Sequence, residues 1–229
     1  MIQRIALITG ASRGLGASLA QCLVLRGWHV VAVARTVGAL EELDDRIKFQ
    51  GQTDSGAMTL APMDITNNDA MRHLCASIYE RFGYINLWAH TAIHAAPLSP
   101  AAHLDAKDIE NSIATNIRAT ASLIPMVEPL LKAASDPTTA LFFDDARAGQ
   151  KFFGAYGATK AAQIAIAQSW AAETVKTGPR VVIESPAPMA TAIRARFFPG
   201  EARSPLIPVL TEAERIIGSL FKAAPPRLG

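Results

Sequence analysis

Six short apolar runs recur along the chain, and longer segments with apolar residues at helical spacing separate them. The runs show little in/out alternation, which is typical of parallel strands covered on both faces. They cover residues 4–9, 29–34, 57–63, 85–90, 139–144 and 180–185. The segments between them predict helices over 14–26, 37–47, 67–82, 105–134 and 153–177, with a final helix near 211–223. Strands and helices alternating in this way predict an α/β fold, a doubly wound parallel sheet in one domain.

Two segments depart from this regular alternation. The helix predicted over 105–134 contains Pro125 and Pro129, which should bend it or end it early. The stretch 187–209 lacks a clear period and separates the last strand from the final helix. Loops of this length in a compact domain often close over a site, so we expect a single domain over 1–229 with a substrate lid at about 187–209.

Composition narrows the class of protein. Half of the 229 residues are hydrophobic and 18% are charged, so the chain can form a substantial core. A net charge of +2 gives no reason to expect a nucleic-acid partner. No apolar run is long enough for a membrane span, and the first residues show no secretory signal, so we expect no membrane partner. The distant cysteines Cys22 and Cys75 are typical of free thiols in a reducing compartment, and we expect a cytoplasmic protein.

The first strand leads directly into a glycine-rich loop, "TGASRGLG", and then into a helix. Glycines at these positions allow a tight turn and a close approach of the backbone, and the following helix offers N–H groups and a positive dipole end to a pyrophosphate. We therefore expect the loop to bind a dinucleotide through Gly10, Ser12, Arg13, Gly14, Leu15 and Gly16.

The residue after the second strand predicts which dinucleotide is bound. An acidic side chain there would bind the ribose 2′-hydroxyl of NAD, whereas an arginine accommodates the 2′-phosphate of NADP. This chain has Arg35 there, and Arg13 lies within the glycine loop. Two guanidinium groups can hold one phosphate, so NADP(H) is the favoured cofactor. The alternative is that both are ordinary surface arginines.

Taken together, the motifs resemble those of the short-chain dehydrogenase/reductase family from about residue 4 to about residue 200. The matching residues are Thr9-Gly10-x-x-x-Gly14-x-Gly16, Asp64-Ile65, Asn116, Tyr156-x-x-x-Lys160 and "SPAPMAT" at 185–191. The resemblance implies a Rossmann-type sheet with helices on both faces, and hydride transfer between a nicotinamide and a carbonyl or alcohol. It also implies that Asp64 and Ile65 line the adenine pocket, with Pro186, Met189 and Thr191 along the nicotinamide. The chain departs from the family at "HTAI" (90–93), where His90 is expected in the cofactor pocket, and at Pro186-Ala187.

Tyr156 and Lys160 are the candidate proton-transfer pair. Residues four apart lie on one face of a helix, and a nearby ammonium lowers the pKa of a tyrosine. The resemblance assigns Tyr156 as the general acid/base, Lys160 as its pKa tuner and ribose contact, and Asn116 as the organiser of a proton relay. A helix in which the tyrosine only packs and the lysine is solvated is the simpler alternative.

The serine that the family places before the tyrosine is missing. Between Ser135 and Ser169 the chain has no serine, and the matching region holds Asp144 and Asp145. A protonated Asp144 could replace the serine as a hydrogen-bond donor. An ionised carboxylate would instead raise the pKa of Tyr156 and repel a developing alkoxide. The third possibility is that both aspartates lie at an exposed strand end.

Two functions follow from these observations. The first is an NADP(H)-dependent oxidoreductase that interconverts a carbonyl and an alcohol on a small molecule, with a 3-oxoacyl thioester as a substrate by analogy alone. The second is an NADP(H)-binding protein with little turnover, acting as a redox sensor or interaction partner. No credible ligand set completes a metal site around the histidines. The resemblance further implies a homodimer or homotetramer formed through the helices at 105–134 and 153–177.

Overall fold

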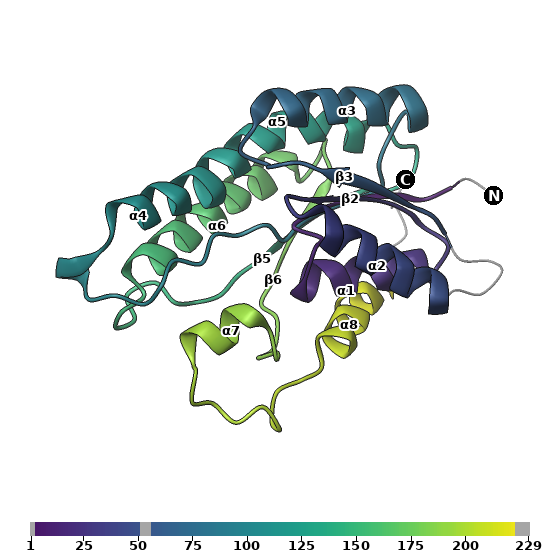
Figure 1. Cartoon of the computed structure of the whole chain (residues 1–229). Coiled ribbons are helices and arrows are strands. Elements are labelled where there is room, and N and C mark those ends of the chain that lie inside the picture. The colour runs from purple at the N-terminus through teal and green to yellow at the C-terminus, as the bar shows by residue number, and fades with distance from the viewer. Residues whose placement is uncertain (1–2, 51–55, 223–229) are drawn as a thin grey trace.

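The computed structural model describes residues 3–50 and 56–222, and they form a six-stranded parallel sheet in the order β3-β2-β1-β4-β5-β6 (Figure 1). Each strand falls within an apolar run of the sequence. The strands are β1 (Ile5–Thr9), β2 (His29–Ala34), β3 (Met58–Pro62), β4 (Leu87–His90), β5 (Thr139–Phe143) and β6 (Arg180–Glu184). The predicted doubly wound, Rossmann-type sheet is confirmed.

Helices cover both faces of the sheet (Figure 1). One face carries α1 (Gly14–Val24), α2 (Val37–Gln50) and α8 (Val209–Lys222). The other carries α3 (Asn68–Phe82), α5 (Ala119–Lys132) and α6 (Gly154–Thr174). Shorter elements are a 3₁₀ turn (Ala101–His103), α4 (Ala106–Ser112), a π-helical segment (Ile113–Arg118) and α7 (Ala192–Phe197).

The four inner strands are buried on both faces, which explains their unbroken apolar runs. Successive side chains of β1 enter opposite cores: Ile5 and Leu7 pack toward α3 and α5, whereas Ala6 and Ile8 pack toward α1 and α8. The edge strands β3 and β6 are only partly buried. The two cores thus fix the register of the inner strands and the positions of the loops that follow them.

Of the two effects expected of the prolines in the long helix, an early end is not observed. Pro125 and Pro129 both lie inside α5, and the irregularity falls earlier, in the π-helical segment Ile113–Arg118. Both prolines are exposed, one turn apart on the outer face, where water can bind the carbonyl groups that they leave without a donor. Leu123 and Val127 are buried on the opposite face and hold the helix to the sheet.

The sheet order reverses between β1 and β4, and in such sheets ligands bind beyond the carboxyl ends of the strands at this point. The segment predicted as a lid, 187–209, contains α7 and lies beyond the same ends. Within the described parts of the chain, no helix combines the length and the apolar character needed to cross a membrane.

Candidate active site

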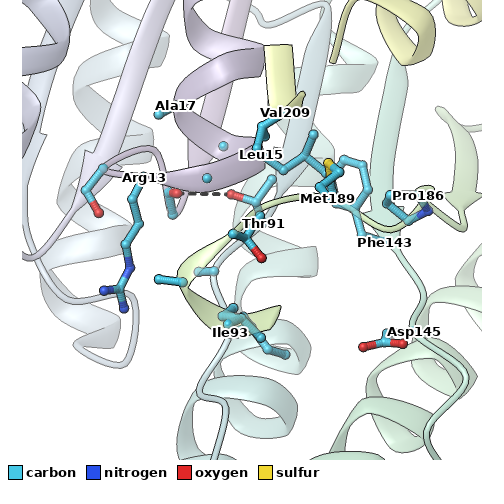
Figure 2. A pocket seen from close by; sticks show the side chains of 18 of the residues that line it. Arg13, Leu15, Ala17, Thr91, Ile93, Phe143, Asp145, Pro186, Met189 and Val209 are labelled. Atoms are coloured by element: carbon cyan, nitrogen blue, oxygen red, sulfur yellow. Dashed lines mark hydrogen bonds between the residues drawn. The ribbon is translucent and has the colours of Figure 1, made fainter. Parts of the chain in front are cut away.

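A cavity of about 680 Å³ opens at the carboxyl ends of the strands. The glycine loop, the strand ends, α6 and the segment 186–198 all contribute to its wall. Figure 2 shows Arg13 and Asp145 at opposite ends of this space, with Thr91 beside the glycine loop and Phe143, Pro186 and Met189 toward the Asp145 end. The residues that border this one cavity thus include both the glycine loop and the Tyr156/Lys160 pair.

The glycine loop is shaped for close backbone contact. Gly10 has a φ of +90°, and a Cβ there would lie 2.5 Å from the backbone nitrogen of Ala92. At Gly16 a Cβ would lie 2.4 Å from the Thr91 hydroxyl oxygen. Helix α1 begins without a side-chain cap and without an acidic residue in its first turn, and its first residues border the cavity. Its N-terminal N–H groups are therefore available to a ligand there. A dinucleotide pyrophosphate fits this donor set.

Three arginines line the part of the cavity near the glycine loop. Arg13 and Arg35 both line the cavity, as do Asp64 and Ile65 after β3. Arg35 lies 3.9 Å from Asp64, and its side chain is 70% exposed, so this long ion pair leaves the guanidinium accessible to an anion. Arg46 on α2 lines the same cavity, which the spacing of the sequence did not indicate.

Tyr156 and Lys160 lie together at the opposite end. Both line the cavity from the first turns of α6, and both are almost fully buried. The Tyr156 hydroxyl donates a hydrogen bond to Asp145 Oδ2 at 3.1 Å, and Asp145 Oδ1 accepts one from Arg147 at 2.9 Å. Asp145, not Asp144, therefore holds the tyrosine hydroxyl. Asp144 lines the cavity, and among the residues that the structure describes its carboxylate has no hydrogen bond or ion pair.

The electrostatics of Tyr156 differ from the expectation that Lys160 lowers its pKa. Burial raises the pKa of Tyr156 well above its usual value, and the negative charge of Asp145 and the hydrogen bond to it raise it further. Arg147 opposes this effect only in part. The structure thus places Asp145 in contact with both Tyr156 and Arg147.

Lys160 lies deeper than its partner. Burial lowers the pKa of its ammonium to about 8, against the opposing influence of the charges on Asp144 and Asp145. Its ammonium donates to the side-chain oxygen of Gln163 at 2.8 Å. Behind it, burial first and then the charge of Lys160 lower the pKa of His90 to about 3, so the imidazole is neutral at physiological pH. The ring of His90 bonds to Thr9 and Thr120, and the residue borders the cavity, as expected.

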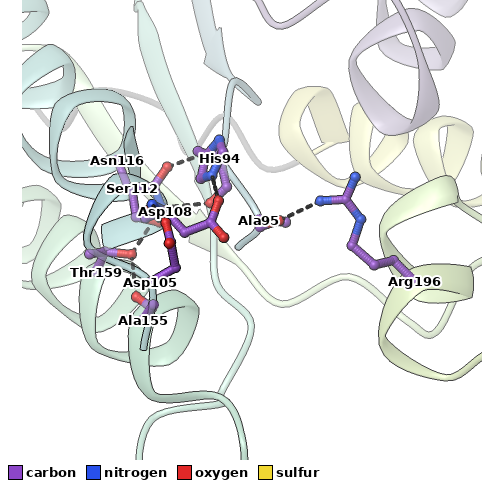
Figure 3. Close-up of polar contacts among 9 residues, drawn as sticks. All are labelled: His94, Ala95, Asp105, Asp108, Ser112, Asn116, Ala155, Thr159 and Arg196. Atoms are coloured by element: carbon purple, nitrogen blue, oxygen red, sulfur yellow. Dashed lines mark hydrogen bonds and ion pairs between the residues drawn. The ribbon is translucent and has the colours of Figure 1, made fainter. Parts of the chain in front are cut away.

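Asn116 does not line the cavity but lies behind its wall. Its side chain binds both backbone groups of His94, accepting from the N–H at 2.8 Å and donating to the carbonyl at 2.9 Å (Figure 3). It also donates to Thr159 on α6. The π-helical segment turns Asn116 inward to make these contacts, and Asn116 thereby fixes the loop after β4 against α6.

An aromatic cluster covers the tyrosine. Phe197 of α7 packs on Tyr156 with ring centroids 4.9 Å apart and on Phe153 at 5.0 Å. Arg196, its neighbour, donates to the Ala95 carbonyl at 2.7 Å (Figure 3). Segment 187–209 therefore contacts the catalytic end of the cavity through α7. The surroundings of Tyr156 on this side are apolar.

Most of the residues predicted for the site border this one cavity. They are Gly10, Ser12, Arg13, Gly14, Leu15, Gly16, Arg35, Asp64, Ile65, His90, Asp144, Tyr156, Lys160, Pro186, Met189 and Thr191. The sequence did not single out Arg147 or Gln163. Gln163 follows Lys160 by three residues on the same helical face, and this spacing is the signal that could have found it.

Comparisons with known proteins agree with this arrangement. The model of the short chain dehydrogenase family matches residues 4–202. An uncharacterised oxidoreductase from Staphylococcus saprophyticus is 31% identical over 192 residues, which cover 83% of this chain and 80% of the relative. A fatty acyl-CoA reductase from Acinetobacter baylyi is 29% identical over 76% of this chain and 58% of its own length. The structure of a putative short chain dehydrogenase from Pseudomonas syringae superimposes with a TM-score of 0.82 at 28% identity, covering 92% of this chain and 86% of that one. These relatives give no support to a binding protein with little turnover.

Proposed function

The chain belongs to the short-chain dehydrogenase family, and from this premise we propose that it is an NADP(H)-dependent oxidoreductase that interconverts a carbonyl and an alcohol. Members of this family use a nicotinamide cofactor. The observation that carries the proposal is one cavity bordered by the phosphate-binding loop at one end and by Tyr156 and Lys160 at the other. A nicotinamide bound between them would supply or accept the hydride.

The choice of NADP(H) over NAD(H) rests on charge. Arg13 and Arg35 border the loop end of the cavity. The acidic side chain that borders the same end is Asp64, which lies 3.9 Å from Arg35. Guanidinium groups bind a phosphate through charge-assisted hydrogen bonds. In this proposal Arg13 and Arg35 hold the 2′-phosphate, and Asp64 and Ile65 lie along the adenine.

Tyr156 is the proton donor in this proposal. Burial and Asp145 hold its pKa far above neutrality, so the hydroxyl carries its proton across the physiological range, and the loss of the Asp145 contact would make it a stronger acid toward a carbonyl oxygen. A substrate oxygen must take the place of Asp145 as the acceptor of the hydroxyl proton. Reduction then transfers this proton from Tyr156 to the oxygen, leaving a phenolate that Lys160 stabilises by its charge.

Asp145 replaces the missing serine in position but not in chemistry. A serine donates a hydrogen bond to the substrate oxygen, whereas a carboxylate paired with Arg147 only accepts. We therefore assign to Asp145 the orientation of the resting tyrosine; Asp144, which the sequence suggested as the substitute for the serine, does not make this contact. Asn116 acts through its side chain as a positioning residue that fixes the loop at His94.

The apolar wall formed by Phe197 and Phe198, which border the cavity, favours a carbonyl compound with a hydrophobic body. A 3-oxoacyl thioester remains a candidate by family analogy, and the acyl-CoA reductase among the relatives points to the same class of acyl chain. The segment 187–209 closes this wall as a lid.

Two further features belong to the proposal. The cysteines Cys22 and Cys75 are both free and buried, which supports a reducing, cytoplasmic environment.

The outer face of α6 exposes the small residues Ala158, Ala161 and Ala165, a surface on which a second subunit can pack closely to give a homodimer or homotetramer. Light scattering of the purified protein measures the subunit number.

The experiment for the main proposal is a comparison of NADPH and NADH oxidation with a panel of hydrophobic ketones, aldehydes and oxoacyl thioesters. Turnover with NADPH that disappears in Tyr156→Phe supports it. Tight NADPH binding without turnover on any of the carbonyl compounds would contradict it.

A further inference from the structure

A continuous set of buried hydrogen bonds joins Lys160 to the strand that carries the glycine loop. The ammonium of Lys160 bonds to Gln163 Oε1 at 2.8 Å, and Gln163 Nε2 bonds to the Thr120 hydroxyl at 3.0 Å. His90 Nε2 lies 3.0 Å from the same hydroxyl, and His90 Nδ1 lies 2.7 Å from the hydroxyl of Thr9. We call these five residues the inner chain. It crosses from α6 through α5 and β4 to β1.

The donors and acceptors of the inner chain have a single consistent direction. An ammonium group can only donate, so the oxygen of Gln163 must face Lys160 and its amide N–H must face Thr120. The Thr120 hydroxyl gives its one proton to the Asn116 carbonyl at 2.9 Å, so it accepts from both Gln163 and His90. His90 then carries its proton on Nε2 and accepts at Nδ1 from Thr9. The side-chain groups of Gln163, Thr120 and His90 all have partners in this arrangement.

This direction leaves Gln163 no freedom to rotate. It is 1% exposed, and reversing its amide would place N–H against the ammonium and oxygen against an oxygen that already accepts. Lys160 keeps two further N–H donors for the cavity that it borders. Gln163 thus fixes the position of the ammonium at the wall of the cavity that Lys160 and Tyr156 both border.

We propose that Gln163 is a positioning residue for Lys160, which fixes the ammonium at the cavity that Tyr156 also borders and stabilises its charged form, with Thr120 and His90 holding Gln163 in place. The inference deepens the proposed function and rests on it for the catalytic importance of Lys160. A carbonyl-type oxygen stabilises a buried cation because it replaces part of the lost hydration.

Other charged and titratable groups around Lys160 set the background for a test. Asp144 and Asp145 face it from the end of β5, Tyr156 precedes it on α6, and His90 lies behind it on β4. Both aspartates favour the charged lysine, and burial opposes it. None of these groups changes when Gln163 is replaced.

The test compares Gln163→Met, which keeps the length without a comparable acceptor, with Gln163→Glu, which adds a negative charge. Gln168→Met on the exposed face of α6 is the matched control. The titration of Lys160 is followed by NMR of isotope-labelled lysine side chains, with its signal identified by its loss in Lys160→Arg. We expect the titration to move about one pH unit lower in Gln163→Met and to move higher in Gln163→Glu, with Gln168→Met unchanged.

Turnover gives a second readout. We expect kcat to fall about tenfold in Gln163→Met, with the alkaline limb of the pH profile following the lysine titration.

If Gln163→Met fails to fold, Thr120→Val removes the other partner of Gln163 and should lower the pH at which Lys160 titrates, as Gln163→Met would. An unchanged titration in folded Gln163→Met and Gln163→Glu would overturn the inference. Wild-type protein without turnover would overturn the proposed function instead, because the lysine titration is measured without it.

Discussion

The hydroxyl of Tyr156 donates its hydrogen bond to the carboxylate of Asp145, 3.1 Å away, and not to a serine or to an open cavity. Burial and this carboxylate both raise the pKa of the tyrosine. The hydroxyl therefore stays protonated at neutral pH, and in the proposed function little phenolate is present to accept a proton from an alcohol. The protonation state of Tyr156 therefore depends on a residue that the sequence alone left ambiguous.

Replacing the carboxylate should release the tyrosine. In Asp145→Ser, the pKa of Tyr156 falls because a negative charge and its hydrogen bond are removed. Alcohol oxidation needs the phenolate, so its activity should appear at a pH lower by about one unit or more and rise about tenfold near neutrality. The pH dependence of NADP⁺ reduction measures this.

Asp144→Ser is the comparison for that experiment. Asp144 contributes least among the groups that raise the pKa of Tyr156, so its replacement should move the profile much less. An equal shift in both variants would show that the charge of the region matters and the contact to Asp145 does not.

Arg35 should determine the cofactor preference. In Arg35→Ser we expect the Kd for NADPH to rise about 10- to 100-fold, while the Kd for NADH changes little, because only NADPH carries the 2′-phosphate. Fluorescence titration with both cofactors measures the two constants. Arg72→Ser, at an exposed position of α3, is the matched control. Equal weakening of both cofactors would remove Arg35 from the phosphate site.

The lid should act on the substrate and not on the cofactor. Phe197 is 4% exposed and packs on Tyr156 and Phe153, so Phe197→Ala opens the apolar wall. We expect the KM of a hydrophobic ketone to rise about tenfold, with the Kd for NADPH unchanged. Steady-state kinetics and cofactor titration separate the two effects. Phe49→Ala, at a side chain 93% exposed, should change neither. A loss of NADPH binding would place α7 over the cofactor instead.

The buried histidine should make the fold sensitive to acid. The pKa of His90 is lowered to about 3 in the folded protein, from an ordinary value of 6.5. Below pH 6.5 the unfolded chain takes up a proton that the folded protein does not, so stability falls as the pH drops from 6.5 toward 3. Between pH 7 and pH 5 this amounts to at most about 2 kcal/mol.

Urea unfolding at the two pH values measures this loss. His90→Asn should reduce the difference, whereas His73→Gln, exposed on α3, should retain it. An unchanged difference in His90→Asn would assign the acid sensitivity to other groups.

Sequence reasoning reached most of the fold because its signals were local. Unbroken apolar runs marked the inner strands, and the glycine loop and the Tyr156/Lys160 spacing each lay within one segment. The π-helical segment that turns Asn116 inward was not predicted, because a one-residue change in hydrogen-bond spacing leaves no mark in apolar periodicity. The exposed prolines of α5 do not end the helix, because tertiary packing on the opposite face outweighs their local cost.

The chemistry of the site was harder to predict. The sequence showed that the serine was missing, but it could not show which aspartate reaches Tyr156, because that depends on the turn between β5 and α6. Nor could it show that Arg147 neutralises Asp145, or that Gln163 and Lys160 share a buried hydrogen bond. These are contacts between side chains whose directions only the folded backbone determines.

The central claim is that Tyr156 transfers the proton in an NADPH-dependent reduction. The most direct measurement is the turnover of NADPH with a hydrophobic ketone or oxoacyl thioester by wild type and by Tyr156→Phe, with the exposed Tyr79→Phe as control. We predict a loss of about 10²- to 10⁴-fold in kcat for Tyr156→Phe, with NADPH binding and the Tyr79→Phe rate unchanged. Equal turnover by wild type and Tyr156→Phe would contradict the account.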